Sequence, residues 1–384
     1  MRDRLGAARA EPGGMHVDLA LVYTPVGGGH KAAALATAEA ARARGLRVAL
    51  VDAFEHAPSW ATEAYLAAHF GGQGLAPAVY GYMYDASNTR GATEAPLRRG
   101  FDHAVFGGLA RAVADLAPRA VVATHHLPLL VLGRARRKGR LDAPLVGVVT
   151  DYGAHACWAE RGVDAWAVAC PEAARDLARH GVDLHRVRLT GIPVRPAFET
   201  CAPVEVPAAG EPLRVLVTSG GFGVGPLERI LRSFGGVPGV ELTVVCGASA
   251  SIRAKVEREV ERSRLAAEVV GFERDMPSRM AAAHVVVGKA GGLTVSEALT
   301  AGRALVLVGA VPGQEKINEA YVAAARAGVA AEPGDVGEVV VGLRAAVSAL
   351  GARGRRAVLS RSADRVVDVA LALRAETLRG TRAA

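Results

Sequence analysis

The chain has 384 residues, of which 51% are apolar and 22% are charged. These values exclude a largely disordered protein, and the length suits two domains of ordinary size. The net charge of +8 gives a pI of about 9.6, but the cations are spread over both halves and form no basic tail of the type that binds nucleic acid. We therefore expect no nucleic-acid partner.

Cysteine usage and hydropathy narrow the location of the protein. The four cysteines lie far apart and form no C-x-x-C pair, which favours a reducing compartment over a disulfide framework or a structural zinc site. No apolar run approaches the roughly 20 residues that a membrane-spanning helix needs. The segment MRDRLGAARAEPGG lacks the apolar core of a signal peptide. We expect a disordered leader over residues 1–18 and a cytoplasmic protein.

The first predicted unit is a strand, a glycine turn and a helix. Residues 19–26 form an apolar run, glycines 27–29 follow, and His30 opens an alanine-rich helix over 31–44. Contiguous glycines followed by histidine match neither the dinucleotide fingerprint nor the P-loop. The helix dipole lowers the pKa of a histidine in the first turn, so His30 is a candidate general base. The alternative is that His30 only caps the helix or packs beneath the loop.

Residues 59–87 hold a concentration of aromatic side chains in a chain that is only 5% aromatic. This segment is either a buried helical pair or an amphipathic surface that touches a lipid interface, where aromatic rings favour the headgroup level. An apolar stripe at helical spacing follows from Leu97 to Leu116, and we expect it to pack in the core. The aromatic residues are Trp60, Tyr65, Phe70, Tyr80, Tyr82 and Tyr84.

Two further features follow in the first half. His125 and His126 come directly after the apolar run AVVAT and either line an acceptor site or serve as satisfied loop histidines. The stretch RARRKGR at 134–140 carries five cations in seven residues. It is either a solvated helix end or a contact for anionic lipid headgroups, to which each cation contributes on the order of 1 kcal/mol.

Alternating strands and helices predict two domains. The first half has apolar runs at 19–26, 46–54, 120–126, 143–152, 165–169 and 187–191, and the second half restarts at 213–223, 240–247, 267–272, 283–289 and 304–310. Short valine- and leucine-rich runs are typical of parallel strands buried on both faces. We predict an α/β fold with two doubly wound domains over 19–195 and 213–350, a proline-rich linker over 196–212, and a helical tail over 351–384.

The second half repeats the glycine turn. Residues 286–297 read VVGKAGGLTVSE, which predicts a strand, a turn at Gly291-Gly292 and a helix. Backbone N–H groups and the positive end of the helix dipole can bind a phosphate at such a turn. Glu297 lies about one and a half turns into the helix, where a carboxylate could accept hydrogen bonds from the two hydroxyls of a ribose. The alternative is an ordinary turn with a surface glutamate.

These motifs resemble the GT28 diacylglycerol glycosyltransferases, the group of monogalactosyldiacylglycerol synthases and processive diacylglycerol glucosyltransferases. The resemblance runs from about residue 19 to about 350, and one departure is Ala290, where the family usually has proline. It rests on GGGH at 27–30, VVTDYGAHACW at 148–158, RLTGIPVRPAF at 188–198, VTSGGFG at 217–223, VVCG at 244–247, VGF at 270–272, KAGGLTVSEAL at 289–299 and PGQEKIN at 312–318.

The resemblance implies a GT-B fold, in which two Rossmann-like domains face each other across a cleft. The C-terminal domain would bind a UDP-sugar and the N-terminal domain a lipid acceptor, such as diacylglycerol, at an anionic membrane surface. His30 would be the base, and Asp151 its rival or its partner. The donor site would comprise Gly220 and Gly221, Gly291 and Gly292 at the diphosphate, Phe272 beside the uracil, Lys289, Glu297 on the ribose, and Gln314 and Glu315 on the sugar; the acceptor site would comprise Gly29, His125, His155 and Trp158.

The implied reaction is a single displacement that inverts the anomeric carbon. The sequence has no D-x-D motif to hold a metal at the leaving diphosphate, so helix N-termini and backbone amides would stabilise the developing charge, with Lys289 as a helper. We expect neither a metal nor a cofactor, and a peripheral position on the inner face of the cell membrane. The alternatives are a transferase for another lipid or a secondary metabolite, a non-catalytic nucleotide-sugar sensor, and a dehydrogenase, for which the glycine spacing is wrong.

Overall fold

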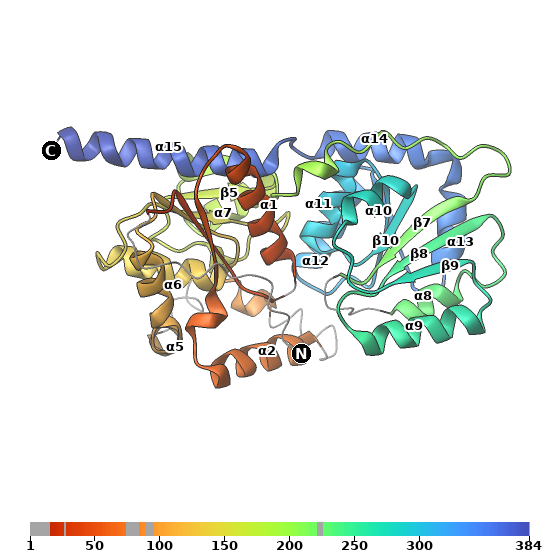
Figure 1. Cartoon of the computed structure of the whole chain (residues 1–384), viewed down its shortest axis with the longest axis horizontal. Coiled ribbons are helices and arrows are strands. Elements are labelled where there is room, and N and C mark those ends of the chain that lie inside the picture. The colour runs from red at the N-terminus through yellow and green to blue at the C-terminus, as the bar shows by residue number, and fades with distance from the viewer. Residues whose placement is uncertain (1–15, 27, 74–83, 90–95, 221–225, 384) are drawn as a thin grey trace.

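The computed structural model describes residues 16–26, 28–73, 84–89, 96–220 and 226–383. It contains two lobes, each built on a parallel six-stranded sheet with helices on both faces (Figure 1). The first sheet has the order β2-β1-β3-β4-β5-β6 and the second the order β12-β11-β10-β7-β8-β9. The prediction of two doubly wound domains is therefore confirmed.

The strands of each sheet are short and mostly apolar. Strands β1, β3, β4 and β5 are buried along their whole length in the first sheet, as are β10 and β11 in the second. The first sheet comprises β1 (Leu19–Tyr23), β2 (Val48–Asp52), β3 (Ala120–Ala123), β4 (Leu145–Val148), β5 (Ala165–Val168) and β6 (Val187–Leu189). The second comprises β7 (Leu213–Thr218), β8 (Val240–Val245), β9 (Ala267–Val270), β10 (Val285–Gly288), β11 (Ala304–Val308) and β12 (Gly328–Ala331).

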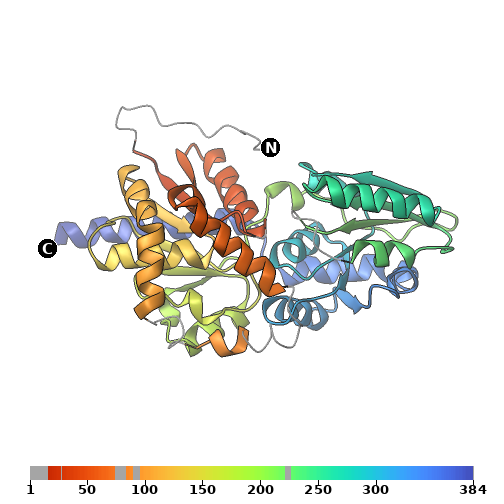
Figure 2. The same ribbon diagram turned by 90° about the horizontal axis from the view of Figure 1, so that it is seen from below.

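The helices lie between the strands, as a doubly wound fold requires (Figures 1 and 2). The first lobe has α1 (Gly29–Ala43), α2 (Ser59–Gln73), α5 (Pro96–Asp115), α6 (His126–Arg137) and α7 (Pro171–Arg179). The second has α8 (Leu227–Arg232), α9 (Ala250–Arg262), α10 (Met276–Ala282), α11 (Gly292–Ala301), α12 (Gln314–Ala324) and α13 (Val336–Gly342). The chain ends in α14 (Val347–Ala357) and α15 (Ser362–Ala383).

Each sheet has a switch point where the strand order reverses. In the first sheet β1 lies between β2 and β3, and in the second β7 lies between β8 and β10. Counted within its own domain, the second sheet has the Rossmann order 3-2-1-4-5-6. Helix α1 follows β1 and α11 follows β10, so both glycine turns lie at the carboxyl ends of strands that border a switch point. This is where open α/β sheets bind ligands.

The predicted tail returns to the first lobe. Helix α15 runs along the N-terminal lobe (Figure 1) and buries Val366, Val367 and Ala370 against a cluster that includes Leu19 and Leu21 of β1. The small residues of α1 allow this helix to approach closely, and Arg44 at the end of α1 forms ion pairs with two aspartates of α15. The predicted stripe on α5 is core, as expected, because Val105, Leu109 and Val113 are buried; the side chains of residues 97 and 101 lie outside the described part.

Candidate active site at the junction of the two domains

His30 is the second residue of α1 and lies over the switch point of the first sheet. Its Nδ1 is 2.9 Å from the carbonyl oxygen of Thr124, directly after β3, and 2.9 Å from Oγ1 of Thr150, after β4. A carbonyl only accepts, so the ring donates from Nδ1 to Thr124, and Nε2 is the nitrogen able to take a proton. The rings of His30 and His125 pack edge to face, with their centroids 4.4 Å apart.

Asp151 lies beside this histidine cluster at the junction with the second domain. Its Oδ1 accepts a hydrogen bond of 2.9 Å from Nδ2 of Asn318 on α12. Burial raises the pKa of Asp151 to about 7, although the Asn318 hydrogen bond lowers it, and the nearby Glu315 carboxylate raises it further. A carboxyl with this pKa can exchange a proton near neutral pH, so the structure keeps Asp151 as a rival to His30 for the role of base.

The N-termini of α1 and α11 meet across the domain junction. A Cβ placed on Gly292, the first residue of α11, would lie 2.1 Å from the carbonyl oxygen of Thr150 and 3.0 Å from Oδ1 of Asp151. A Cβ on Gly29 would lie 3.5 Å from Cβ of Leu293. Glycine at 292 is thus required by the approach of the two domains, a reason that the sequence pattern did not reveal. Gly291 is the N-cap of α11 and has no such neighbour within 4 Å.

Glu297 lies in the second turn of α11 and is half-buried. No hydrogen bond or ion pair of its carboxyl is present within the described ranges, and Arg195 is the cation whose field acts on it. Burial raises the pKa of Glu297 to about 8, and Arg195 offsets only part of that increase. A carboxyl that loses part of its hydration without gaining a partner is costly, and a ligand that supplies donors would lower that cost. Arg195 itself donates to the backbone oxygen of Arg274 and lies 3.4 Å from Glu39.

The turn between β11 and α12 is tied to the second glycine turn. Lys289 Nζ lies 3.0 Å from Oε1 of Glu315, whose Oε2 accepts from the backbone N–H of Val311 at 2.8 Å. Within the described part of the chain, Oε1 of Gln314 is buried without a hydrogen-bond partner. Gly313 has φ of 95°, and the ring of Tyr84 covers it so closely that a Cβ there would lie 2.8 Å from ring carbons. Lys289, Gln314 and Glu315 are thus brought together.

The structure gives the predicted acceptor-side residues structural contacts. His125 is buried and caps α6 by accepting from the N–H of Leu127 at 3.1 Å. His155 caps the 3-10 helix Ala156–Trp158 through Nδ1, and its Nε2 lies 3.3 Å from the carbonyl oxygen of Tyr84. Trp158 is buried, and the centroids of its ring and of the His126 ring are 6.2 Å apart. These contacts fix the loops that carry the three residues, and the roles of these residues toward an acceptor stay predictions.

Two predicted donor residues lie away from this cluster. Gly220 follows β7 with φ of 70°, a left-handed conformation that suits glycine, and its N–H donates to Oγ1 of Thr218. Phe272, after β9, is 63% exposed. Gly221 lies outside the described residues. The ring of Phe272 presents a free apolar face, as the predicted place beside a base requires, but its role stays a prediction.

Asn318 is the site residue that sequence reasoning missed. Its side chain is fully buried; Oδ1 accepts from the N–H of Tyr152 at 2.9 Å, and Nδ2 also donates to the carbonyl oxygen of Ala290 at 2.8 Å. A second link joins the domains where the hydroxyls of Tyr152 and Ser296 lie 2.9 Å apart. The Tyr152 ring stacks on Tyr321 with centroids 4.0 Å apart. Asn318 stands in the quoted PGQEKIN motif, but its partners are 28 and more residues away in sequence.

The features predicted to meet a membrane have mixed outcomes. No helix in the described ranges is long and apolar enough to cross a bilayer. Trp60 is 58% exposed at the start of α2, whereas Tyr65 packs on Phe54 with ring centroids 5.6 Å apart. Phe70 has no described side chain, and Tyr80 and Tyr82 lie outside the described residues. In the basic stretch, Arg136 pairs with Asp164 at 2.9 Å and Arg137 pairs with Glu160. A lipid contact stays a prediction.

Two protein families match successive parts of this chain. Residues 30–194 match the family described as monogalactosyldiacylglycerol (MGDG) synthase, and residues 230–332 match the C-terminal domain of glycosyltransferase family 28. The first lobe thus matches an MGDG synthase family and the second lobe a glycosyltransferase family 28 C-terminal domain. The first match begins at His30 and includes Asp151, and the second includes every predicted donor residue from Phe272 to Glu315. The resemblance read from the motifs is therefore confirmed.

Individual relatives and solved structures agree with this family. The chain is 28% identical over 200 residues to a processive diacylglycerol beta-glucosyltransferase of Bacillus cytotoxicus, and 26% identical over 211 residues to one of Bacillus cereus. Each match covers about half of both proteins: 50% and 53% of this chain, 52% and 54% of the relatives. The chain therefore spans about half the length of the curated relatives it matches.

Two solved structures share the fold of this chain over most of its length. Acinetobacter baumannii MurG has a TM-score of 0.61 at 18% identity, with 92% of this chain and 99% of MurG covered. Anabaena Alr3699/HepE, solved in complex with UDP, has a TM-score of 0.53 at 14% identity, with 94% and 100% covered. At these identities the likeness shows the fold alone, and it confirms the predicted GT-B class.

Proposed function

We propose that this chain is an inverting, metal-independent hexosyltransferase that moves a sugar from a UDP-sugar to a lipid hydroxyl, with diacylglycerol as the acceptor. One observation carries the proposal: the N-termini of α1 and α11 meet at the domain junction, with His30 on one side and the unpaired carboxyl of Glu297 on the other. The names of the Bacillus relatives and the MGDG synthase match support the lipid acceptor and the hexose, and the UDP complex of HepE supports the nucleotide.

The chemistry assigns one task to each side of the junction. Nε2 of His30 takes the proton of the acceptor hydroxyl, while Nδ1–H stays bonded to Thr124, which stabilises the imidazolium that forms. The acceptor oxygen attacks the anomeric carbon as the bond to the diphosphate oxygen breaks, so the configuration inverts. Backbone N–H groups at the start of α11 face the negative charge that develops on the diphosphate, and Lys289 adds a cation.

The nucleotide is held by the second domain in this proposal. The Glu297 carboxyl gains two ribose hydroxyls as partners, which offset the hydration that this half-buried acid has lost. Gln314 and Glu315 face the sugar from the first turn of α12. The buried Oε1 of Gln314, without a partner in the described part, and the Lys289–Glu315 pair are the groups that sugar hydroxyls would satisfy or rearrange.

The reaction lends itself to a direct assay. The purified chain is incubated with radiolabelled UDP-glucose, UDP-galactose or UDP-N-acetylglucosamine and with diacylglycerol in mixed micelles, and the lipid products are separated by polarity. We expect label in a glycolipid with one of the three donors, and a β-linked product by NMR would establish inversion of the α-linked donor. Release of free sugar alone, or transfer only to acceptors other than diacylglycerol, would refute the acceptor assignment.

A further inference from the structure

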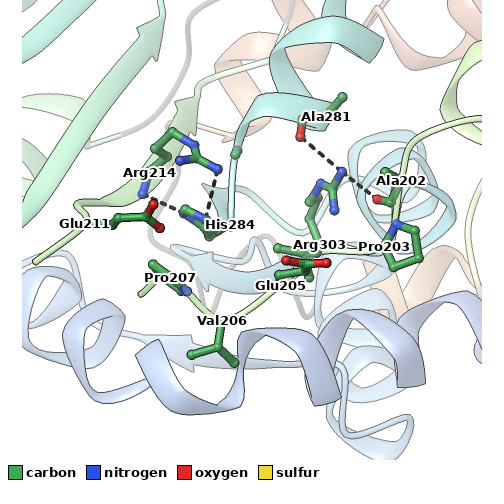
Figure 3. A pocket seen from close by; sticks show the side chains of 12 residues that line it. Ala202, Pro203, Glu205, Val206, Pro207, Glu211, Arg214, Ala281, His284 and Arg303 are labelled. Atoms are coloured by element: carbon green, nitrogen blue, oxygen red, sulfur yellow. Dashed lines mark hydrogen bonds between the residues drawn. The ribbon is translucent and has the colours of Figure 1, made fainter. Parts of the chain in front are cut away.

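The amino ends of the second sheet carry a pocket that the proposed reaction does not use. Arg214 is the second residue of β7, while His284 and Arg303 directly precede β10 and β11, so parallel strands bring the three to one edge. The pocket has a volume of about 300 Å³, and the linker segment 202–207 forms one of its walls (Figure 3). It lies at the opposite end of the strands from Gly220 and Lys289.

His284 presents a donor to this pocket. The backbone N–H of Arg214 donates to Nδ1 of His284 at 2.8 Å, so that nitrogen carries no proton. Burial and the neighbouring arginines lower the pKa of His284 to about 4, and the neutral ring therefore has its proton on Nε2. Nε2 lies 3.0 Å from Nη2 of Arg214, which is also a donor (Figure 3). Two donors thus face each other.

Arg303 supplies a third donor. Its side chain is 2% exposed; Nε donates to the carbonyl oxygen of Met280 at 2.7 Å, and Nη2 donates to those of Ala202 and Ala281 at 3.0 and 3.1 Å. Nη1 is buried and has no acceptor within the described residues. A buried guanidinium N–H without an acceptor is unfavourable, so this arrangement favours a ligand that accepts hydrogen bonds.

Two acidic residues also line the pocket, and the Glu211 carboxylate is close enough to act on the ring of His284. Glu211 uses Oε2 to accept from the N–H of Ala208 at 3.0 Å, and Glu205 is exposed on the linker wall. The lining therefore combines two arginines and a neutral histidine donor with two carboxylates at the rim. We propose that this pocket binds a small oxyanion of the phosphate class, which accepts from Nε2 of His284 and from Arg214 beside the buried guanidinium of Arg303.

Such an anion would also tie the linker to the second domain. Arg303 already holds the linker through the carbonyl oxygen of Ala202, and Arg355 of α14 donates to the same oxygen at 3.2 Å. An oxyanion bound beside Arg303 would therefore lie against the segment that connects the two lobes. The site is independent of the proposed transferase reaction, because its residues lie at the other end of the sheet.

The test is calorimetric titration of the full chain with inorganic phosphate, at an ionic strength held constant with sodium chloride. We expect one saturable site per chain that persists when UDP is saturating. Arg214→Gln should weaken phosphate about tenfold, as expected for loss of one charge-assisted hydrogen bond. Glu205→Gln should strengthen it, because a nearby negative charge is removed. Arg229→Gln, an exposed arginine elsewhere in the same domain, is the matched control and should leave phosphate affinity unchanged.

Several results would overturn the assignment. Displacement of phosphate by UDP would place the anion in the nucleotide site, and equal weakening in Arg214→Gln and Arg229→Gln would reduce the effect to general charge. Absence of saturable binding in the wild-type chain would also refute it. Arg214 is exposed, but its Nε donates to the carbonyl oxygen of Ala282 at 2.6 Å. The unfolding temperature of the variant in phosphate-free buffer is therefore measured as well, so that weaker binding is distinguished from misfolding.

Discussion

The two ends of the second sheet contain opposite kinds of unsatisfied groups. At the carboxyl ends of the strands, burial raises the pKa of Glu297, and also that of Asp151, which approaches from the first domain next to the N-terminus of α11. At the amino ends, donors of His284 and Arg214 face one another, and Nη1 of Arg303 lacks an acceptor within the described residues. The first set suits a ligand that offers hydroxyl donors beside a phosphate, and the second suits an anion alone.

This contrast follows from the geometry of parallel sheets. Helices that follow strands direct their N-termini and free N–H groups to the carboxyl ends of the strands, where these groups can bind a phosphate. Carboxylate side chains at the same end can then accept hydrogen bonds from hydroxyl groups of the ligand. The amino ends receive the C-termini of the preceding helices, where Arg303 donates to the carbonyl oxygens of α10 residues Met280 and Ala281. Cationic side chains donate hydrogen bonds to these carbonyl groups. Such a side chain favours an anion only when one of its N–H groups has no acceptor.

The largest effect that would test the carboxyl-end site is on turnover. We expect His30→Ala to lower kcat about a hundredfold or more, the usual contribution of a positioned base, while UDP affinity stays nearly unchanged because the nucleotide lies on the other domain. Thr150→Val, which removes only a hydroxyl near Nδ1, should cost much less. Steady-state kinetics and calorimetry measure both quantities. If Asp151→Asn abolishes activity and His30→Ala retains it, Asp151 is the base.

The next effect separates two carboxylates at the same end of the sheet. Glu297→Ala should weaken UDP and UDP-sugar by about ten- to a hundredfold, because a bidentate charge-assisted contact contributes roughly 1.5–3 kcal/mol. Glu315→Ala should lower activity and blur the preference among sugars with little change in UDP affinity, because its proposed partner is the sugar. Calorimetry with UDP on both variants decides between them. The opposite pattern would mean that the two placements are reversed.

Much of this arrangement was predictable from sequence, because buried parallel strands appear as apolar runs and glycine turns mark their carboxyl ends. Strand β12 was missed, since Gly328–Ala331 is short, has one valine, and pairs so closely that a Cβ on Gly328 would lie 2.4 Å from the carbonyl oxygen of Leu305. Asn318 was missed because its hydrogen bonds join segments that only the folded domains bring together. The Arg303 pocket was missed because strand starts carry no motif.

A smaller effect concerns stability against pH. The folded pKa of Glu297, about 8, exceeds the ordinary glutamate value of 4.5, so the unfolded chain loses that proton first as the pH rises. The free energy of unfolding should therefore fall between about pH 4.5 and 8. Glu297→Gln lacks this loss and should unfold at a higher temperature than wild type at pH 8.5, but at nearly the same temperature at pH 4.5. A difference that is equal at both pH values would contradict burial of an ionisable Glu297.

The smallest expected effect is that of a chelator. No group of three or more His, Cys, Asp or Glu side chains suited to a metal ion lies within the described ranges, and the sequence has no D-x-D motif. If α11 and Lys289 stabilise the leaving diphosphate, transfer should continue at the wild-type rate in excess EDTA. Lys289→Ala should then lower kcat more than it lowers UDP affinity, since the charge on the diphosphate grows toward the transition state. Loss of activity in EDTA, restored by magnesium or manganese, would show that the carboxyl end depends on a cation after all, and the contrast between the two ends of the sheet would no longer explain how the phosphate is held.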